Sequence, residues 1–280
     1  MERSKPSRTA LGVALRRAVH QLHDAPLVLD DAVAVHILRA TYADALQAMS
    51  EGRDERFSRA MRAFLVARSR YAEDKLREAV AAGVGQYVLL GAGLDTFAHR
   101  NPHTELRVFE VDHPATQAWK RELLEKSGVA IPASLRYAPV DFEVQSLSAQ
   151  LQSAGFNAEA PAFFAWLGVV PYLTLSAFRA TLEFVEARPA GSGVVFDYGQ
   201  PRKALPLVDR LVHDALLARV RLAGEPFQLF LTSAEMAREL ARFMRLEDLG
   251  STEVNARYFS GRADRLAMRG AGGRMVSAWK

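Results

Sequence analysis

The sequence predicts an α/β fold in which helices precede an open, mostly parallel sheet. Up to Gly83, apolar residues recur at every third or fourth position, a spacing typical of amphipathic helices. Beyond Gly83, short apolar runs alternate with longer helical segments, as in successive βαβ units. With 280 residues, the chain is expected to form one domain around a single large core.

The expected elements follow from this periodicity. Helices are expected over residues 9–83, interrupted at Pro26 and at residues 50–54. Parallel strands are expected at residues 86–90, 106–111, 135–140, 162–167 and 193–198, joined by helices at 115–126, 144–154 and 176–187 that are long enough for right-handed crossovers. Two more helices, 205–222 and 233–243, precede strands at 245–249 and 274–279, and the last strand is expected to insert antiparallel.

Composition excludes several kinds of protein. The chain has no cysteine, which excludes disulfides, thiolate zinc sites and a cysteine nucleophile. Its N-terminal stretch lacks the apolar core of a secretory signal, and no apolar run approaches the roughly 20 residues that cross a bilayer. We therefore expect a cytoplasmic protein with no membrane partner. The net charge of +4 is spread along the chain, so no nucleic-acid partner is expected either.

A glycine turn directly follows the first expected strand. Gly91, Ala92 and Gly93 stand where the backbone turns tightly and a ligand approaches it closely, although an ordinary strand-to-helix turn explains the pair of glycines equally well. Thr96 occupies the place of the third glycine of a dinucleotide site, which disfavours NAD and FAD. S-adenosylmethionine carries no phosphate and needs close backbone and polar contacts instead. The turn therefore favours this cofactor.

Carboxylates end the next two strands. Asp112, 21 residues after Gly91, is expected to accept hydrogen bonds from both ribose hydroxyls, with the initiation of a turn as its alternative role. Asp141 is expected to bond the adenine amino group while Phe142 packs on the ring, and its alternative role is to cap the helix at 144–154. Both carboxylates are expected at the crevice formed by the carboxyl ends of parallel strands.

The fourth strand leads into the expected substrate side of the site. Residues 167–172 are expected to form the floor between cofactor and substrate, and Tyr172 is a candidate for positioning the substrate. The substrate walls are expected to come from the N-terminal helices and from residues 205–230, which are apolar with interspersed arginines.

Five stretches, in order along the chain, resemble the leucine carboxyl methyltransferase family, and more closely its bacterial branch of S-adenosylmethionine-dependent methyltransferases. They are Ala67-Arg-Ser-Arg-Tyr71, Leu90-Gly-Ala-Gly-Leu-Asp-Thr96, Phe109-Glu-Val-Asp-His-Pro114 with Lys120, Val140-Asp-Phe142 and Gly168-Val-Val-Pro-Tyr-Leu173. The resemblance implies a class I methyltransferase fold, with a Rossmann-like seven-stranded sheet under a lid of N-terminal helices. On this basis residues 1–84 form the lid, 85–200 the cofactor-binding core, 201–245 a helical substrate-side insertion and 246–280 the C-terminal strands.

The resemblance also implies roles for individual residues. It makes Arg68 the anchor of the cofactor's carboxylate, with Arg70 as the near alternative, because a guanidinium fork suits that group. Two departures stand out: Leu167 replaces a glutamate of many members, and Phe97 and His99 replace the arginine and tyrosine of many bacterial relatives. The complete set expected to bind the cofactor is Arg68, Arg70, Gly91, Ala92, Gly93, Asp112, His113, Asp141, Phe142 and Leu167.

The predicted function is methyl transfer from S-adenosyl-L-methionine to an oxygen of a small metabolite or natural product, with S-adenosyl-L-homocysteine as the second product and no metal. A carboxylate acceptor is favoured by analogy with the family, and it needs no general base because it is already ionised. A phenol or alcohol would use a base, for which the histidines considered are His20, His23, His36, His99, His113 and His213. The alternatives are an NAD(P)-dependent oxidoreductase and a non-catalytic cofactor-binding module.

Overall fold

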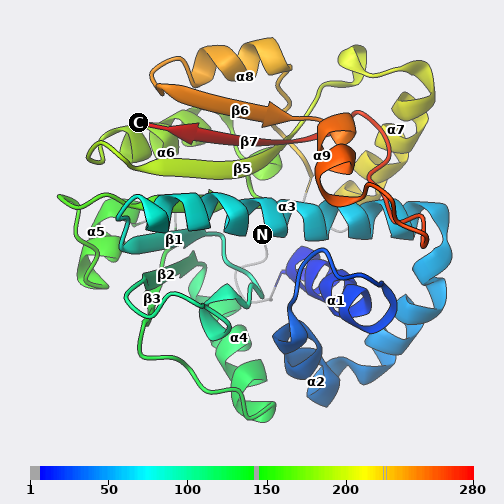
Figure 1. Cartoon of the computed structure of the whole chain (residues 1–280), viewed down its shortest axis with the longest axis horizontal. Helices are drawn as coiled ribbons and strands as arrows, with labels where there is room; N and C mark the ends of the chain where they lie inside the picture. Colours follow the sequence, from blue (N-terminus) through cyan, green and yellow to red (C-terminus); the bar gives the residue numbers. More distant parts are fainter. Residues whose placement is uncertain (1–6, 142–144, 223, 225) are drawn as a thin grey trace.

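The computed structural model describes residues 7–141, 145–222, 224 and 226–280. They form a seven-stranded sheet of order β3-β2-β1-β4-β5-β7-β6 (Figure 1). The first five strands pair in parallel and β7 inserts antiparallel between β5 and β6, which confirms the predicted topology. The strands are β1 (Gln86–Leu90), β2 (Arg107–Asp112), β3 (Leu135–Pro139), β4 (Phe163–Trp166), β5 (Gly193–Gly199), β6 (Arg245–Leu249) and β7 (Gly273–Trp279).

The helices follow the predicted order with differences at their ends. They are α1 (Arg8–His23), α2 (Ala32–Glu51), α3 (Arg56–Ala81), α4 (Pro114–Lys126), α5 (Leu147–Ser153), α6 (Leu175–Glu186), α7 (Leu207–Leu222), α8 (Ser233–Glu239) and α9 (Ser251–Tyr258). Short 3-10 turns lie at η1 (Gly52–Asp54), η2 (Phe97–His99), η3 (Val170–Tyr172) and η4 (Arg202–Ala204). In the described part of the chain, no helix is both long and apolar enough to span a membrane.

Three helix predictions need correction. Helix α5 begins at Leu147, because Ser146 caps it by accepting a hydrogen bond from the Ala149 N–H at 3.2 Å. The alternative role of Asp141 as the cap of this helix is therefore wrong. Helix α8 ends at Glu239 and not at residue 243, because the buried apolar residues that continue the periodicity belong to a following turn. Helix α9 lies where only a connection was expected.

Alternation along the strands divides the core between the two faces of the sheet. On β1, Tyr87 and Leu89 pack with α3 and α9, whereas Val88 and Leu90 pack with α5, α6 and α8. Because the strand is buried on both faces, the four residues after Gln86 read as a continuous apolar run. Helix α3 has 26 residues, which at 1.5 Å per residue makes it about 39 Å long, and it crosses one face of the sheet (Figure 1).

The first two helices form a third packing unit beside the sheet. Residues of α1 and α2 pack against α4 and against Leu94 in the turn after β1 (Figure 1). This arrangement places α1 next to the carboxyl ends of the strands, where the resemblance predicts a lid. The predicted division of the chain into lid, core, insertion and C-terminal strands stays a prediction.

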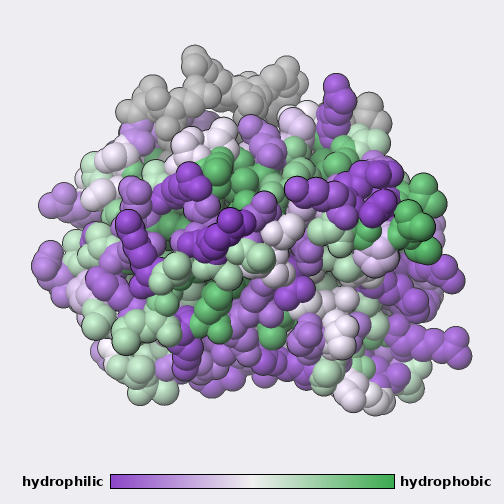
Figure 2. Space-filling model, turned by 90° about the horizontal axis from the view of Figure 1, so that it is seen from above, coloured by the Kyte–Doolittle hydropathy of each residue, from purple (hydrophilic) through white to green (hydrophobic). Residues whose placement is uncertain are grey.

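Helix α7 lies at the end of the sheet where β5 ends, beside the start of α3, and one of its faces is exposed (Figure 1). Leu207, Val208 and Leu211 of this helix are 75%, 76% and 72% exposed. Seen from above, the molecule is mostly hydrophilic, with apolar side chains gathered at the right-hand edge where α7 lies (Figure 2).

Candidate active site

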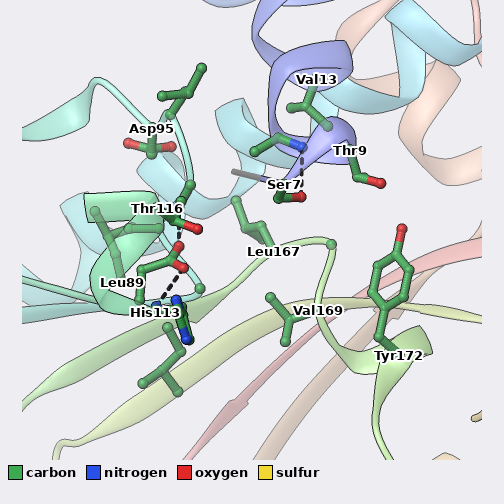
Figure 3. Close-up of a pocket in the computed structure, with 18 of the residues that line it drawn as sticks. Ser7, Thr9, Val13, Leu89, Asp95, His113, Thr116, Leu167, Val169 and Tyr172 are labelled. Atoms are coloured by element: carbon green, nitrogen blue, oxygen red, sulfur yellow. Dashed lines mark hydrogen bonds between the residues drawn. The ribbon is translucent and has the colours of Figure 1, made fainter. Parts of the chain in front are cut away.

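A pocket of about 590 Å³ lies at the carboxyl ends of β1, β2 and β4. Its floor comes from the turns that follow β1 and β4, and one side comes from the ends of β2 and β3. Helix α1 covers it with Thr9, Ala10, Val13, Ala14 and Arg17 (Figure 3). Tyr172 and residues 224, 226 and 228 close the far end, so the N-terminal helix and the 205–230 segment both contribute walls.

The turn after β1 fits its place only with glycine. Gly91 and Gly93 have φ values of +68° and +52°, which residues with a side chain rarely adopt. A Cβ on Gly91 would lie 2.4 Å from the Val169 Cγ2 atom, and one on Gly93 would lie 3.2 Å from the Ala10 Cβ atom. The backbone therefore passes closely between the β4 turn and α1.

Asp112 closes one side of the pocket. Its Oδ2 atom accepts a hydrogen bond from the Gly93 N–H at 2.6 Å and its Oδ1 atom accepts one from the His113 N–H at 2.7 Å. Burial raises the pKa of Asp112 above its usual value, although these two N–H groups act in the opposite direction. His113 begins helix α4, and its Nδ1 atom accepts a hydrogen bond from the Ala115 N–H at 3.2 Å.

The two candidate arginines on α3 lie in different surroundings. Arg68 is buried in the pocket wall, where its Nη1 atom donates to the Asp197 Oδ2 atom at 3.1 Å. The Nε atom of Arg68 is buried without a hydrogen-bond partner. Arg70, in contrast, is not among the lining residues, and its half-exposed side chain pairs with Asp74 at 2.9 Å.

A buried ionic network ties α1 to the glycine turn. Arg17 pairs with Asp31, donates to the Thr96 Oγ1 atom at 2.6 Å and lies 3.5 Å from the Asp95 Oδ2 atom. Burial alone would lower the pKa of Arg17, but Asp31 and Asp95 outweigh it and hold the pKa above its usual value. Arg17 and Asp95 both line the pocket, so the network fixes α1 directly over it.

The far end of the pocket is mostly apolar. Figure 3 shows Leu167 and Val169 between the side that holds His113 and the end that holds Tyr172. The hydroxyl of Tyr172 points toward Thr9 of α1 in this view. The Tyr172 ring meets the Phe227 ring edge-on, with centroids 4.9 Å apart, which anchors the end wall in an aromatic pair.

The family model for leucine carboxyl methyltransferases matches residues 10–186, which span α1, the glycine turn, both carboxylates and the β4 turn. The chain belongs to the leucine carboxyl methyltransferase family. It is therefore an S-adenosyl-L-methionine-dependent methyltransferase, as the sequence predicted. Neither the oxidoreductase nor the non-catalytic alternative is favoured by this match.

Relatives of this methyltransferase cover most of its length. YktD of Bacillus subtilis (strain 168), provisionally named an S-adenosyl-L-methionine-dependent methyltransferase, is 32% identical over 294 residues, which cover 95% of this chain and 96% of YktD. A relative from Mycolicibacterium smegmatis with the same provisional name is 33% identical over 230 residues, covering 79% and 74% of the two chains.

Solved structures support the class I methyltransferase fold. A DUF574 family protein from Streptomyces avermitilis MA-4680 has a TM-score of 0.55 at 18% identity, with 96% of this chain and 97% of that chain covered. A Thermobifida fusca YX protein, provisionally described as a methyltransferase, has a TM-score of 0.56 at 16% identity, with 91% and 96% covered. These similarities concern the fold alone.

The structure brings most of the predicted cofactor residues of the methyltransferase to one pocket. Arg70 lies outside it, and Phe142 lies outside the described residues. Asp141 is at the pocket, where its backbone N–H donates to the Gln145 Oε1 atom at 2.9 Å. The predicted residues that line the pocket are Arg68, Gly91, Ala92, Gly93, Asp112, His113, Asp141, Leu167 and Tyr172.

The polar residues at this site that were not predicted from the sequence include Arg17 and Asp197. Arg17 lies in a helix whose main sequence signal is its apolar periodicity. Its partners Asp31 and Thr96 are distant in sequence, so no local pattern indicates the contacts. Asp197 follows a continuous buried run in β5, and it contacts Arg68 across 129 positions of chain. A polar residue inside an otherwise buried strand is the one local signal that marks Asp197.

Proposed function

We propose that this pocket binds S-adenosyl-L-methionine and that the enzyme methylates an oxygen atom, with a carboxylate favoured, of a small metabolite or natural product. The cofactor supplies a methyl group already activated on a sulfonium, and S-adenosyl-L-homocysteine remains after transfer. The observation that favours a carboxylate over a phenol as acceptor is that the described residues at the Tyr172 end of the pocket include no histidine.

The donors and acceptors around the pocket fit the two ends of this cofactor. Arg68 lines the pocket, and a carboxylate is the group that a guanidinium fork binds best. Each carboxylate oxygen of Asp112 already accepts one N–H and has capacity for a ribose hydroxyl as well. In this arrangement Asp141 lies on the adenine side of the cofactor, and the backbone of the glycine turn contacts its methionine part.

The positions of the histidines favour an acceptor that needs no general base. Among the described lining residues, His113 is the only histidine, and its Nδ1 atom accepts the Ala115 N–H. It also lies at the opposite end of the pocket from Tyr172 (Figure 3). His20, whose Nδ1 atom is 2.8 Å from the Asp24 Oδ2 atom, is buried in the contacts of α1. An ionised carboxylate needs no proton removed, so it suits such a site better than a phenol.

The walls near Tyr172 favour an acceptor with an apolar body. Val13, Leu167, Val169 and Pro226 line the pocket together with the Tyr172 ring, and Gln228 adds a polar group at the far end. The enzyme's own contribution is to align the acceptor oxygen with the methyl group and to keep water out, which α1 does by covering the pocket. Positioning of this kind supplies up to about 7–11 kcal/mol of the barrier reduction in well-oriented reactions.

The experiment is transfer of a labelled methyl group from the cofactor to a panel of carboxylic acids and phenols that carry apolar bodies. Methyl esters release methanol in mild base, whereas methyl ethers do not, so base treatment of the product identifies the acceptor atom. We expect base-labile label with acids as acceptors. Transfer exclusively to nitrogen or carbon would exclude O-methylation, and base-stable label on phenols alone would exclude the carboxylate.

A further inference from the structure

The carboxylate of Asp197 joins two parts of the pocket that come from distant segments. It projects from β5, where it is only 4% exposed. Its Oδ1 atom accepts a hydrogen bond from the Gly168 N–H at 2.6 Å, and its Oδ2 atom accepts one from the Arg68 Nη1 atom at 3.1 Å. One buried side chain thus holds both the turn after β4 and the arginine on α3.

These contacts define where the guanidinium of Arg68 lies. Gly168 has a φ of +70°, and a Cβ placed on it would lie 2.8 Å from both the Nη1 and Nη2 atoms of Arg68. The guanidinium therefore packs directly over the glycine, and only a residue without a side chain leaves room for it. With Nη1 held by Asp197, the planar group has a fixed orientation where Arg68 lines the pocket.

We propose that Asp197 is a positioning residue, which orients Arg68 and the Gly168 turn to receive the amino-acid end of the cofactor. This inference rests on the proposed function, in which Arg68 binds the cofactor's carboxylate. Asp197 does not line the pocket itself, so it acts through the two groups that it holds. It also supplies the negative charge that a buried guanidinium needs when no ligand is bound.

The test compares two ligands that differ only at the amino-acid end. S-adenosylhomocysteine carries the carboxylate and amino group, whereas 5′-methylthioadenosine lacks both, and calorimetry measures the affinity for each. In Asp197→Asn, the amide oxygen still accepts the Gly168 N–H, but the amide nitrogen cannot accept from Arg68. We expect affinity for S-adenosylhomocysteine to fall about tenfold or more, the size of one charge-assisted hydrogen bond, and affinity for 5′-methylthioadenosine to stay within about twofold.

A matched control separates positioning from a general loss of stability. Asp248 on β6 also accepts from one arginine, Arg274 at 2.9 Å, and from one other donor, the Tyr198 hydroxyl at 2.7 Å, but it is not among the residues that line the pocket. Asp248→Asn is expected to leave both affinities within about twofold. Equal losses for both ligands in Asp197→Asn, or no loss for either, would overturn the inference.

A second pair of variants serves if the unpaired arginine prevents Asp197→Asn from folding. Arg68→Gln and the double variant Arg68→Gln/Asp197→Asn leave no buried unpaired cation, and they are expected to bind S-adenosylhomocysteine equally. A further loss in the double variant would overturn the inference, because the asparagine still accepts the Gly168 N–H and the arginine has already been removed. Wild-type protein that binds neither ligand would overturn the proposed function itself, and this inference with it.

Discussion

Replacing Gly91 by alanine tests how tightly the cofactor turn is packed. The new Cβ would lie 2.4 Å from the Val169 Cγ2 atom, closer than side-chain carbons approach, at a φ of +68°. The left-handed backbone costs an alanine about 1–2 kcal/mol. Forcing the extra atom into a packed contact adds about 1–3 kcal/mol. We therefore expect Gly91→Ala to lower the free energy of unfolding by about 2–5 kcal/mol, and to weaken cofactor binding because the turn has to shift.

Gly128 provides the control, because its φ is also +68° and a Cβ on it would meet nothing within 4 Å. Gly128→Ala is expected to cost only the backbone term of about 1–2 kcal/mol. Urea unfolding followed by tryptophan fluorescence measures both variants. Adding Val169→Ala to Gly91→Ala should restore part of the difference by removing the atom that clashes. Equal destabilisation by the two alanines, or no recovery with the double variant, would refute the packing argument.

Three further predictions concern charged residues. Burial raises the pKa of Asp112, so this carboxylate takes up a proton at a higher pH than an ordinary aspartate does. We therefore expect the affinity for S-adenosylhomocysteine, measured by calorimetry, to begin falling at that higher pH as the solution is acidified. Asp112→Asn should show no such decline. Arg70→Ala should leave that affinity within about twofold and the free energy of unfolding within about 1 kcal/mol, since the exposed pair lies outside the pocket. Arg17→Met should cost about 1–3 kcal/mol in urea unfolding by removing one of the two arginines that pair with Asp31, and no measurable cost would contradict the network's role.

The parts of the fold that were predictable are those with strong local signals. The expected bounds of β1 and β6 match the structure, and the other strand ends shift by no more than one residue, because buried strands carry continuous or alternating apolar runs. Helix α9 was missed because Gly250, which has no side chain to accept a hydrogen bond, precedes it and its eight residues bury mainly Val254. The end of α8 was misplaced because Leu240 and Phe243 are buried in a turn that continues the helical spacing.

The residues of the site likewise fall into two groups, those that a local sequence signal predicts and those that only long-range contacts define. Glycines and carboxylates that follow strands stand out in the sequence, because the carboxyl ends of parallel strands define the crevice of such a fold. The contacts of Arg68 with Asp197 and of Arg17 with Asp31 and Thr96 depend on how α3 and α1 dock on the sheet, which no local pattern encodes. The choice between Arg68 and Arg70 likewise follows from helix rotation, which directs one side chain to the pocket and the other toward Asp74.

Strand β7 lies between β5 and β6, although it is the last of the three to be made. During synthesis, β1 to β4 have all their strand neighbours once β5 has emerged, but β5 gains its second neighbour, and β6 its only one among the described strands, once residues 273–279 exist. The same segment brings Trp279 to stack on Phe163, with ring centroids 5.0 Å apart. A truncation before Gly273 would therefore leave two open edges to which other chains can add, and it would cause aggregation rather than a frayed terminus.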